Sequence, residues 1–341
     1  MRVCLYLLSI LIFCSCLADQ KISQGKFFRL LKIQPNEQEA LKFGGIKILR
    51  TIYRAHLEGR DRLELIDCGI GDLAPLAYLP DLEWLRLSHN PIKDITPLAN
   101  LKKLQVLSLY GMPKNRSLAT GGISDLTPLM ELKNLWSLTL DENNITDLKP
   151  LSELDGLRTL YLTHNNIIDV SPLSQLTGLK KLYLAHNNIK DISALANLNE
   201  INCLTLSSNE ISDLSVLEKF FNLQKFSASN NKIYGLASLK KLTLLEELKL
   251  DGNEIREVEN LFPLNELKEI YLANNQISSV SAFREMNKLR VLDIANNQVE
   301  DLSSLFGLKT LRTLIIKGNP FEEAQVKSLK LALPKCKIVL N

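Results

Sequence analysis

Three side chains that could bind a metal ion recur at one position of the sequence. Glu142, His164 and His186 each stand directly before an asparagine and follow one another at 22-residue intervals. If the chain returns to the same place every 22 residues, one carboxylate and two imidazoles lie in a column at steps of about 5 Å. Such a set, with one position left open, would suit zinc. The alternative is that these residues are ordinary solvated variants of a repeated position, and we predict no bound metal or other cofactor.

Aromatic side chains stand at matching positions in the same part of the chain. Tyr161 and Tyr183 each lie four residues before an asparagine, so neighbouring strands would bring them about 4.8 Å apart. Tyr and Trp offer rigid, amphipathic surface of the kind that dominates protein interfaces. We therefore predict a partner-binding patch, with cross-strand support of the sheet as the alternative role for these tyrosines. The predicted patch comprises Trp84, Arg86, His89, Tyr110, Asp141, Glu142, Tyr161, His164, Lys181, Tyr183 and His186.

The sequence contains no signature of catalysis. It has no G-x-S-x-G nucleophile motif, no phosphate-binding loop and no H-E-x-x-H motif. Cys203 and His186 fall in different columns of the repeat, so we expect no Cys–His pair. The 41 basic and 38 acidic side chains give a net charge of +3, which is too balanced for a protein that neutralises nucleic-acid phosphates. We predict that the protein is not an enzyme and does not bind nucleic acid.

A repeat of 22 residues must position all of these side chains. The segment L-T-L-D-E-N-N-I-T-D-L contains Asn143, and the pattern continues at each 22nd residue to Asn319. The alternation in L-x-L places two leucines on one face of a short strand, and stacked repeats join these leucines into one core. A buried asparagine can satisfy backbone donors and acceptors in every turn. Cys68 takes the place of the asparagine in the first repeat, where we expect a small buried side chain, and Met112 takes it in the third.

The pattern L-x-x-L-x-L-x-x-N-x-I-x-D-[LIV]-x-P-L resembles leucine-rich repeats, in particular the 22-residue repeats of bacterial internalins. The resemblance covers about four-fifths of the chain, in twelve repeats. It implies an α/β solenoid, a curved horseshoe with a parallel β-sheet on its concave face. The prolines that follow the strands suit a convex side made of tight or single-turn segments.

The two ends of such a solenoid need caps, because terminal repeats expose leucine edges. We predict a helical N-terminal cap over residues 19–59, with helix from Lys26 to Leu57 interrupted at Gly44–Gly45. The repeats extend over 60–332. A helix over Glu322–Leu333 and a strand within the C-terminal cap, 333–341, close the other end.

The first eighteen residues have the layout of a signal peptide. Arg2 is followed by an apolar stretch and then by small residues, with Ala18 at the predicted cleavage site. The segment around Cys16 also resembles a lipidation motif, which would make Cys16 a lipid anchor and the membrane contact of a lipoprotein. A third alternative is an uncleaved anchor helix. We predict an exported protein that is secreted, periplasmic or attached to the cell surface.

An insertion interrupts the repeat at residues 113–122. Lys114 and Arg116 make it basic, and insertions in solenoids often belong to a binding face. The alternative is a neutral insertion in a tolerant loop. Together these features predict an exported, noncatalytic protein–protein interaction module that binds a protein on its concave face. The alternative function is a cell-envelope or extracellular glycan-binding adhesin, in which the tyrosines and Trp84 stack on sugar rings.

Overall fold

The computed structural model describes residues 26, 40–111 and 122–340, in two compact units that divide after Gly156. The predicted signal peptide, the lipidation candidate Cys16 and the insertion residues Lys114 and Arg116 lie outside the described residues. Within the described ranges, no helix is both long and apolar enough to cross a membrane.

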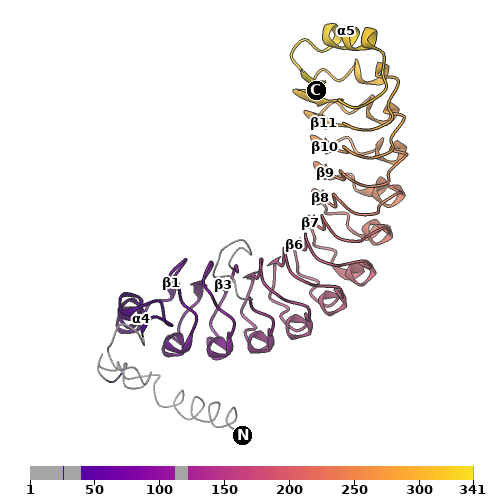
Figure 1. The fold of residues 1–341 in the computed structure, drawn as a ribbon. Coiled ribbons are helices and arrows are strands. Elements are labelled where there is room, and N and C mark those ends of the chain that lie inside the picture. Colours follow the sequence, from indigo (N-terminus) through magenta and orange to yellow (C-terminus); the bar gives the residue numbers. More distant parts are fainter. Residues whose placement is uncertain (1–25, 27–39, 112–121, 341) are drawn as a thin grey trace. The chain divides into compact units, whose positions relative to one another are not determined.

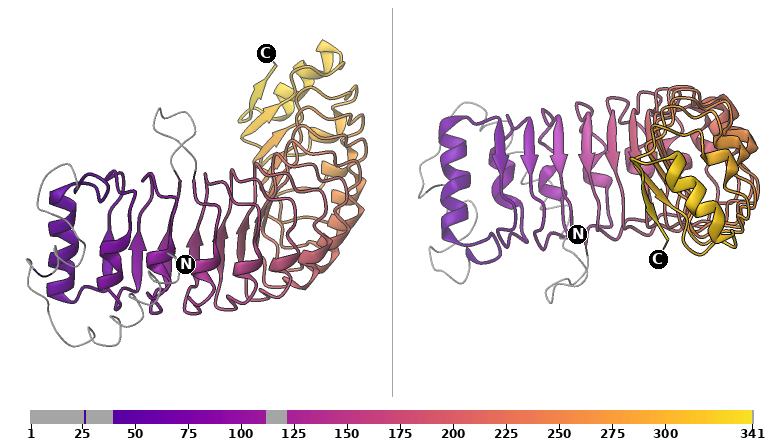
Figure 2. Two further views of the ribbon diagram at one scale, coloured as in Figure 1. Left: turned by 60° about the horizontal axis from the view of Figure 1, so that its bottom comes forward. Right: turned by 90° about the horizontal axis from the view of Figure 1, so that it is seen from above.

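The first unit begins its described part with a helix that precedes the strands, as predicted. Helix α4 (Ile46–Glu58) starts directly after Gly44 and Gly45, which both have positive φ, and it buries Leu49 and Ile52. A Cβ atom at Gly44 would lie 2.5 Å from the carbonyl oxygen of Cys68, so only glycine fits there. The predicted interruption at these two glycines is therefore the point at which α4 begins. Figure 2 shows α4 packed along one end of this unit.

The strands are short, parallel and stacked in chain order within each unit. Residues with the same place in the repeat pair across neighbouring strands, so Leu160, Leu182 and Leu204 lie side by side in the core. The strands of the first unit are β1 (Arg62–Glu64), β2 (Trp84–Arg86), β3 (Val106–Ser108) and β4 (Ser137–Thr139). Those of the second unit are β5 (Thr159–Tyr161), β6 (Lys181–Tyr183), β7 (Cys203–Thr205), β8 (Lys225–Ser227), β9 (Glu247–Lys249), β10 (Glu269–Tyr271), β11 (Val291–Asp293), β12 (Thr313–Ile315) and β13 (Lys337–Val339).

Single turns of 3₁₀ helix return the chain from one strand to the next, and several have a predicted proline as their second residue. In the second unit the strands line the inner side of its bend, and these turns line the outer side (Figure 1). The 3₁₀ helices of the first unit are η1 (Ala74–Tyr78), η2 (Thr96–Leu98), η3 (Thr127–Leu129) and η4 (Lys149–Leu151). Those of the second are η5 (Ser171–Leu173), η6 (Ser193–Asn197), η7 (Ser215–Lys219), η8 (Ala237–Lys241), η9 (Glu259–Leu261), η10 (Ser281–Phe283) and η11 (Ser303–Leu305).

The end of the second unit is covered by helix α5 (Glu323–Ala332), which packs beside η11, and by β13. Both elements agree with the predicted C-terminal helix and closing strand. Helix α5 buries Val326 and Leu329, and β13 pairs with β12, so the last leucines of the solenoid are shielded from water.

We call each 22-residue repeat a rung and number the rungs by their asparagine, so that rung five contains Asn165 and rung twelve Asn319. The asparagine column binds successive rungs together. In rung six, Asn187 donates from Nδ2 to the carbonyl oxygens of Leu162 and Leu184 at 2.9 and 3.1 Å. Its Oδ1 accepts the N–H of Ile167 at 3.0 Å. These bonds satisfy buried backbone groups of two rungs at once, which confirms the predicted role of the column.

The first rung differs from the others at this position. Cys68 is half-buried rather than fully buried, because no strand precedes β1 in the described part of the chain. Its backbone N–H still donates to Oδ1 of Asn90 at 2.9 Å. Its Sγ donates to the carbonyl oxygen of Ile66 at 3.3 Å, the carbonyl two residues back that the asparagine of a later rung also binds.

A second column, of aspartates, begins the 3₁₀ turns. In rung seven, Oδ1 of Asp213 accepts the backbone N–H of Ser215 at 2.8 Å, and Asp169 and Asp191 make the same bond in rungs five and six. The carboxylate thereby satisfies a backbone donor at the start of the turn, as a capping residue does in a longer helix. The aspartate in the repeat pattern is therefore a structural residue.

Candidate functional site

The side chains exposed on the strands of the second unit form the face that we call the strand face (β5–β10). At one end of it, the rings of Tyr161 on β5 and Tyr183 on β6 stack with centroids 4.5 Å apart and planes 3° from parallel. The predicted proximity of these two rings is therefore confirmed. Both tyrosines are half-buried, so each ring supports its neighbour and still presents an edge and a hydroxyl to solvent.

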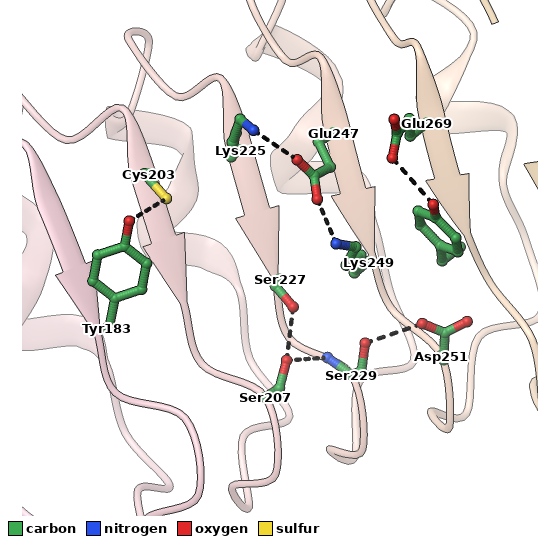
Figure 3. Close-up of polar contacts among 11 residues, drawn as sticks. Tyr183, Cys203, Ser207, Lys225, Ser227, Ser229, Glu247, Lys249, Asp251 and Glu269 are labelled. Carbon is green, nitrogen blue, oxygen red and sulfur yellow. Dashed lines mark hydrogen bonds and ion pairs between the residues drawn. The ribbon is translucent and has the colours of Figure 1, made fainter. Parts of the chain in front are cut away.

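The Tyr183 hydroxyl is held by the next strand. Sγ of Cys203 on β7 donates to it at 3.5 Å (Figure 3). Burial raises the pKa of Tyr183, and the hydrogen bond with Cys203 raises it further. The hydroxyl is therefore neutral at physiological pH and can both donate and accept a hydrogen bond.

Small polar side chains occupy the middle of the strand face. Ser207 and Ser227 share a hydrogen bond of 2.7 Å, and the Ser207 hydroxyl also accepts the backbone N–H of Ser229 at 3.1 Å. The Ser229 hydroxyl donates to Asp251 Oδ2 at 3.1 Å, which completes a chain of bonds across three rungs (Figure 3). These bonds hold short polar side chains close to the sheet.

Charged groups lie at the other end of the strand face. Glu247 on β9 forms ion pairs with Lys225 on β8, at 3.0 Å, and with Lys249 (Figure 3). Burial works against ionisation of Glu247, but the two lysines outweigh it and hold its pKa below the usual value. The Lys249 ammonium also lies 5.3 Å from the centre of the Tyr271 ring.

Tyr271 is fixed by its own hydrogen bond. Its hydroxyl donates to Glu269 Oε2 at 3.1 Å. Burial and the neighbouring carboxylates raise the pKa of Tyr271 to about 12. The strand face therefore has a tyrosine pair at one end, a charged cluster with one tyrosine at the other, and short polar side chains between them.

The predicted patch is divided between the two units, and the part in the first unit has its own contacts. The guanidinium of Arg62 lies 5.0 Å from the Trp84 ring, and Arg86 pairs with Glu64 at 3.2 Å. The rings of His89 and Tyr110 lie 4.9 Å apart, and burial raises the pKa of Tyr110 with help from nearby carboxylates. Trp84 Nε1 and His89 Nδ1 are buried without a hydrogen-bond partner among the described residues.

One residue of the predicted patch is not exposed as expected. Asp141 is buried, with 7% of its surface accessible. The reason is the place of its column, two residues before the asparagine, where a side chain accepts a backbone N–H of the next rung. Asp251, in the same column, accepts the N–H of Ala273 at 3.0 Å. Asp141 is therefore unsuited to a direct contact with a partner.

The proposed metal ligands occupy a column with an unusual backbone. Glu142, His164 and His186 all have positive φ, between 54° and 57°. Later rungs place Asn230 and Gly252 there, residues that tolerate this left-handed conformation, as histidine does to a lesser degree. The backbone therefore accounts for much of the residue choice in this column.

The two imidazoles are also poorly arranged for a shared ion. The rings of His164 and His186 stack with centroids 4.0 Å apart and planes 7° from parallel. A metal ion binds a ring nitrogen in the plane of the ring, so stacked rings direct their lone pairs side by side rather than toward one point. Among the described residues, no group of three His, Cys, Asp or Glu side chains could hold a metal ion.

Lys181, which belongs to the predicted patch, lies exposed on β6. The predicted patch does not include the charged cluster of Lys225, Glu247 and Lys249. A signal for this cluster was available, because opposite charges stand at matching positions on consecutive strands, where cross-strand pairs form.

Comparison with known proteins agrees with this architecture. A family model described as leucine-rich repeats matches residues 80–129, 177–219 and 265–307. The crystal structure of an internalin (inlF) from Listeria monocytogenes is 29% identical and superposes with a TM-score of 0.81 over 90% of this chain and 91% of that chain. The chain has the leucine-rich repeat fold, and its repeats are similar to those of bacterial internalins.

Two further solved structures resemble this leucine-rich repeat protein in fold. A leucine-rich repeat protein of Leptospira interrogans is 21% identical, with a TM-score of 0.60 over 93% of this chain and 98% of that chain. The ectodomain of an Arabidopsis thaliana receptor kinase, solved in complex with a Casparian strip integrity factor, is 18% identical, with a TM-score of 0.58 over 82% of this chain and 41% of that chain. A search of curated proteins gave no match. Leucine-rich repeat proteins of this kind are typically noncatalytic protein-interaction modules.

Proposed function

We propose that this leucine-rich repeat protein is an exported, noncatalytic interaction module that binds a protein partner on the strand face of its second unit. The observation that carries the proposal is the order of side chains along that face. The Tyr161–Tyr183 pair and the Lys249–Tyr271 contact flank a strip of short polar residues on β7 and β8.

This arrangement suits a protein partner for energetic reasons. The tyrosines supply large, rigid contact area, and stacking and hydrogen bonds already restrict their side chains, so binding orders few additional groups. The strip of short side chains leaves room for a partner's side chains to approach the sheet. The paired charges of Lys225, Glu247 and Lys249 would favour a complementary surface and disfavour others.

A glycan is the weaker candidate for the same face. Stacking on a sugar requires the open face of an aromatic ring, whereas Tyr161 and Tyr183 cover one face of each other. In the first unit, the Arg62 guanidinium lies over the Trp84 ring. The aromatic groups that the sequence suggested for sugar stacking are thus partly covered.

Export is the second part of the proposal, and it rests on the sequence of residues 1–18. Mass spectrometry of the N-terminus of the protein from its natural source tests it. A chain that begins at Asp19 supports cleavage by signal peptidase, and a lipid-modified Cys16 supports a lipoprotein anchored to a membrane. An intact Met1 in the mature protein would contradict both.

Partner binding is tested by capture of envelope and medium proteins on immobilised residues 19–341, with Tyr161→Ser/Tyr183→Ser compared against the unmodified chain. We expect the amount of specifically captured partner to fall at least tenfold in the double variant, because the two rings form the main contact area in this proposal. The thermal stability of the double variant should change little. Phe221→Ser is the matched control, since Phe221 is 56% exposed and lies just after the outer 3₁₀ helix η7. Equal losses in both variants, or no loss in the double variant, would contradict the proposal.

A further inference from the structure

Three consecutive rungs of the second unit depart from the aspartate column. At the position that Asp169, Asp191 and Asp213 occupy in rungs five to seven, rungs eight to ten have Gly235, Glu257 and Ser279. The aspartate returns in rung eleven, where Asp301 accepts the N–H of Ser303 at 2.8 Å. Rungs eight to ten therefore lack the aspartate along one stretch of the turn edge, which is the part of each rung between the asparagine and the 3₁₀ helix.

The backbone does not require glycine at position 235. Gly235 is not among the residues with positive φ, and no atom lies within 4 Å of the place where its Cβ would be. An aspartate would therefore fit there and could accept the Ala237 N–H, as Asp213 accepts that of Ser215. Glycine has no side chain that could accept the Ala237 N–H, and it leaves open space on the surface.

That space is a hollow of about 430 Å³ on the turn edge. Tyr234 stands beside it with 67% of its surface exposed, and it is the only aromatic side chain among the lining residues in this described part of the chain. The polar lining consists of Glu254, Arg256, Glu257, Asn260 and Gln276, with Gly235 at one side.

These groups combine two features that suit one kind of ligand. An exposed aromatic ring offers an apolar platform, and planar side chains around it offer both hydrogen-bond donors and acceptors. A pyranose ring has an apolar C–H face and a rim of hydroxyl groups that each donate and accept. We propose that this hollow binds a pyranose unit of a saccharide, with the sugar stacked on Tyr234 and its hydroxyls bound by Glu254, Arg256, Asn260 and Gln276.

The lining distinguishes a neutral sugar from a cation. Two carboxylates, Glu254 and Glu257, would attract a partner's lysine or arginine, but Arg256 lies between them in the sequence and in the same hollow. Nε of Arg256 donates to Gln276 Oε1 at 3.0 Å, which holds the guanidinium at the site. One Arg and two Glu leave a net charge of only −1, while six of the lining side chains, including Tyr234, can hydrogen-bond.

This inference is independent of the protein-binding proposal. The hollow lies on the turn edge of rungs eight to ten, whereas Tyr161, Tyr183 and the charged cluster project from the strands. A saccharide at this edge and a protein on the strand face could be bound at once, so loss of one activity need not affect the other.

Saturation-transfer NMR on residues 19–341 tests the saccharide site with methyl glycosides of glucose, galactose, mannose and N-acetylglucosamine. We expect at least one glycoside to receive saturation, with a Kd on the order of millimolar, as befits a small ligand in an open site. Nα-acetyl-arginine amide serves as the cationic probe. Transfer to no glycoside, or to the arginine probe alone, would overturn the proposal.

Two variants connect such a signal to the hollow. Tyr234→Ala removes the platform, and Gly235→Asp fills the space while restoring the capping group, so each should reduce the transfer at least tenfold. Gly235→Asp should keep or raise the melting temperature, which separates loss of binding from loss of folding. Glu300→Ala, at the position of Tyr234 in rung eleven, should leave the signal unchanged. Unchanged transfer in Tyr234→Ala and Gly235→Asp would place the sugar elsewhere and overturn the assignment.

Discussion

Rungs five to seven and rungs eight to ten of the second unit share one interior but differ on two surfaces. Asn187 and Asn253 make the same bonds to backbone groups of their own rung and the preceding one. On the strands, the first group presents a tyrosine pair and the second presents ion pairs. On the turn edge, the first group has capping aspartates, whereas the second has the hollow beside Tyr234.

The difference shows which positions the fold dictates. The asparagines do not vary between the groups and the core positions stay apolar, although Phe226 and Ala228 replace leucines in rung eight, because each of these residues fills core space or satisfies a buried backbone group. The strand face and the turn edge can vary separately because their side chains lie on different sides of the same rung. Each surface can therefore acquire a ligand without altering the core.

The largest expected effect tests the shared interior. Asn187→Ala and Asn253→Ala should each lower the free energy of unfolding by about 3 kcal/mol or more, since several buried backbone groups lose their partner. Urea denaturation measures this, with Asn188→Ala as the exposed control. A marked difference between the two buried variants would mean that the rung groups differ in their interior as well.

An intermediate effect is expected at the turn edge, with opposite signs in the two groups. Asp213→Ala should lower stability by about 1 kcal/mol through loss of a cap, and Gly235→Asp should raise it by about 0.5–1 kcal/mol. Thermal and urea melts of both variants measure the changes. Destabilisation by Gly235→Asp would show that this turn cannot take the conformation of its neighbours.

The smallest effect concerns two carboxylates on the strands, Glu247 on β9 and Asp293 on β11, and the pH dependence of their contribution to stability. The Glu247 pKa is lowered in the folded state, so its contribution is present above the unfolded pKa of about 4.3 and is lost as pH falls through the folded value. Burial raises the Asp293 pKa, so stability is lost as pH rises from about 3.9 through the folded value.

Consequently Glu247→Gln should destabilise slightly at pH 7, by less than about 1 kcal/mol, and Asp293→Asn should stabilise slightly. Both differences from the unmodified chain should shrink as the pH is lowered from 7 toward 3 and each carboxyl group takes up its proton. Urea melts across this pH range compare the two variants. Parallel pH dependence for both would contradict the assigned signs.

Much of the fold could be predicted because one spacing governs it. The position of Asn187 or Leu182 follows from counting 22 residues, and so does the adjacency of Tyr161 and Tyr183. The interruption at Gly44–Gly45 and the C-terminal helix and strand were also expected from local signals, and α4, α5 and β13 agree with them.

The site could be predicted less well, because exposure depends on contacts between rungs. Asp141 has the same alternation as an exposed residue, yet its own side chain is buried, and Asp251 in the same column is half-buried and bonded to the next rung. Glu142, His164 and His186 have the residue types of a metal site, but their spacing is that of the repeat. Their positive φ accounts for much of the residue choice. The hollow depends on what is missing at Gly235, which becomes visible only when the neighbouring turns are compared.

Site-specific photo-crosslinking tests the central claim most directly. A photoreactive residue at Thr205, on β7 between the two ends of the strand face, should form an adduct with the protein partner captured from envelope or medium. The same residue at Lys219, in the outer 3₁₀ helix of the same rung, should form none. Adducts from position 219 without any from position 205 would contradict binding on the strand face.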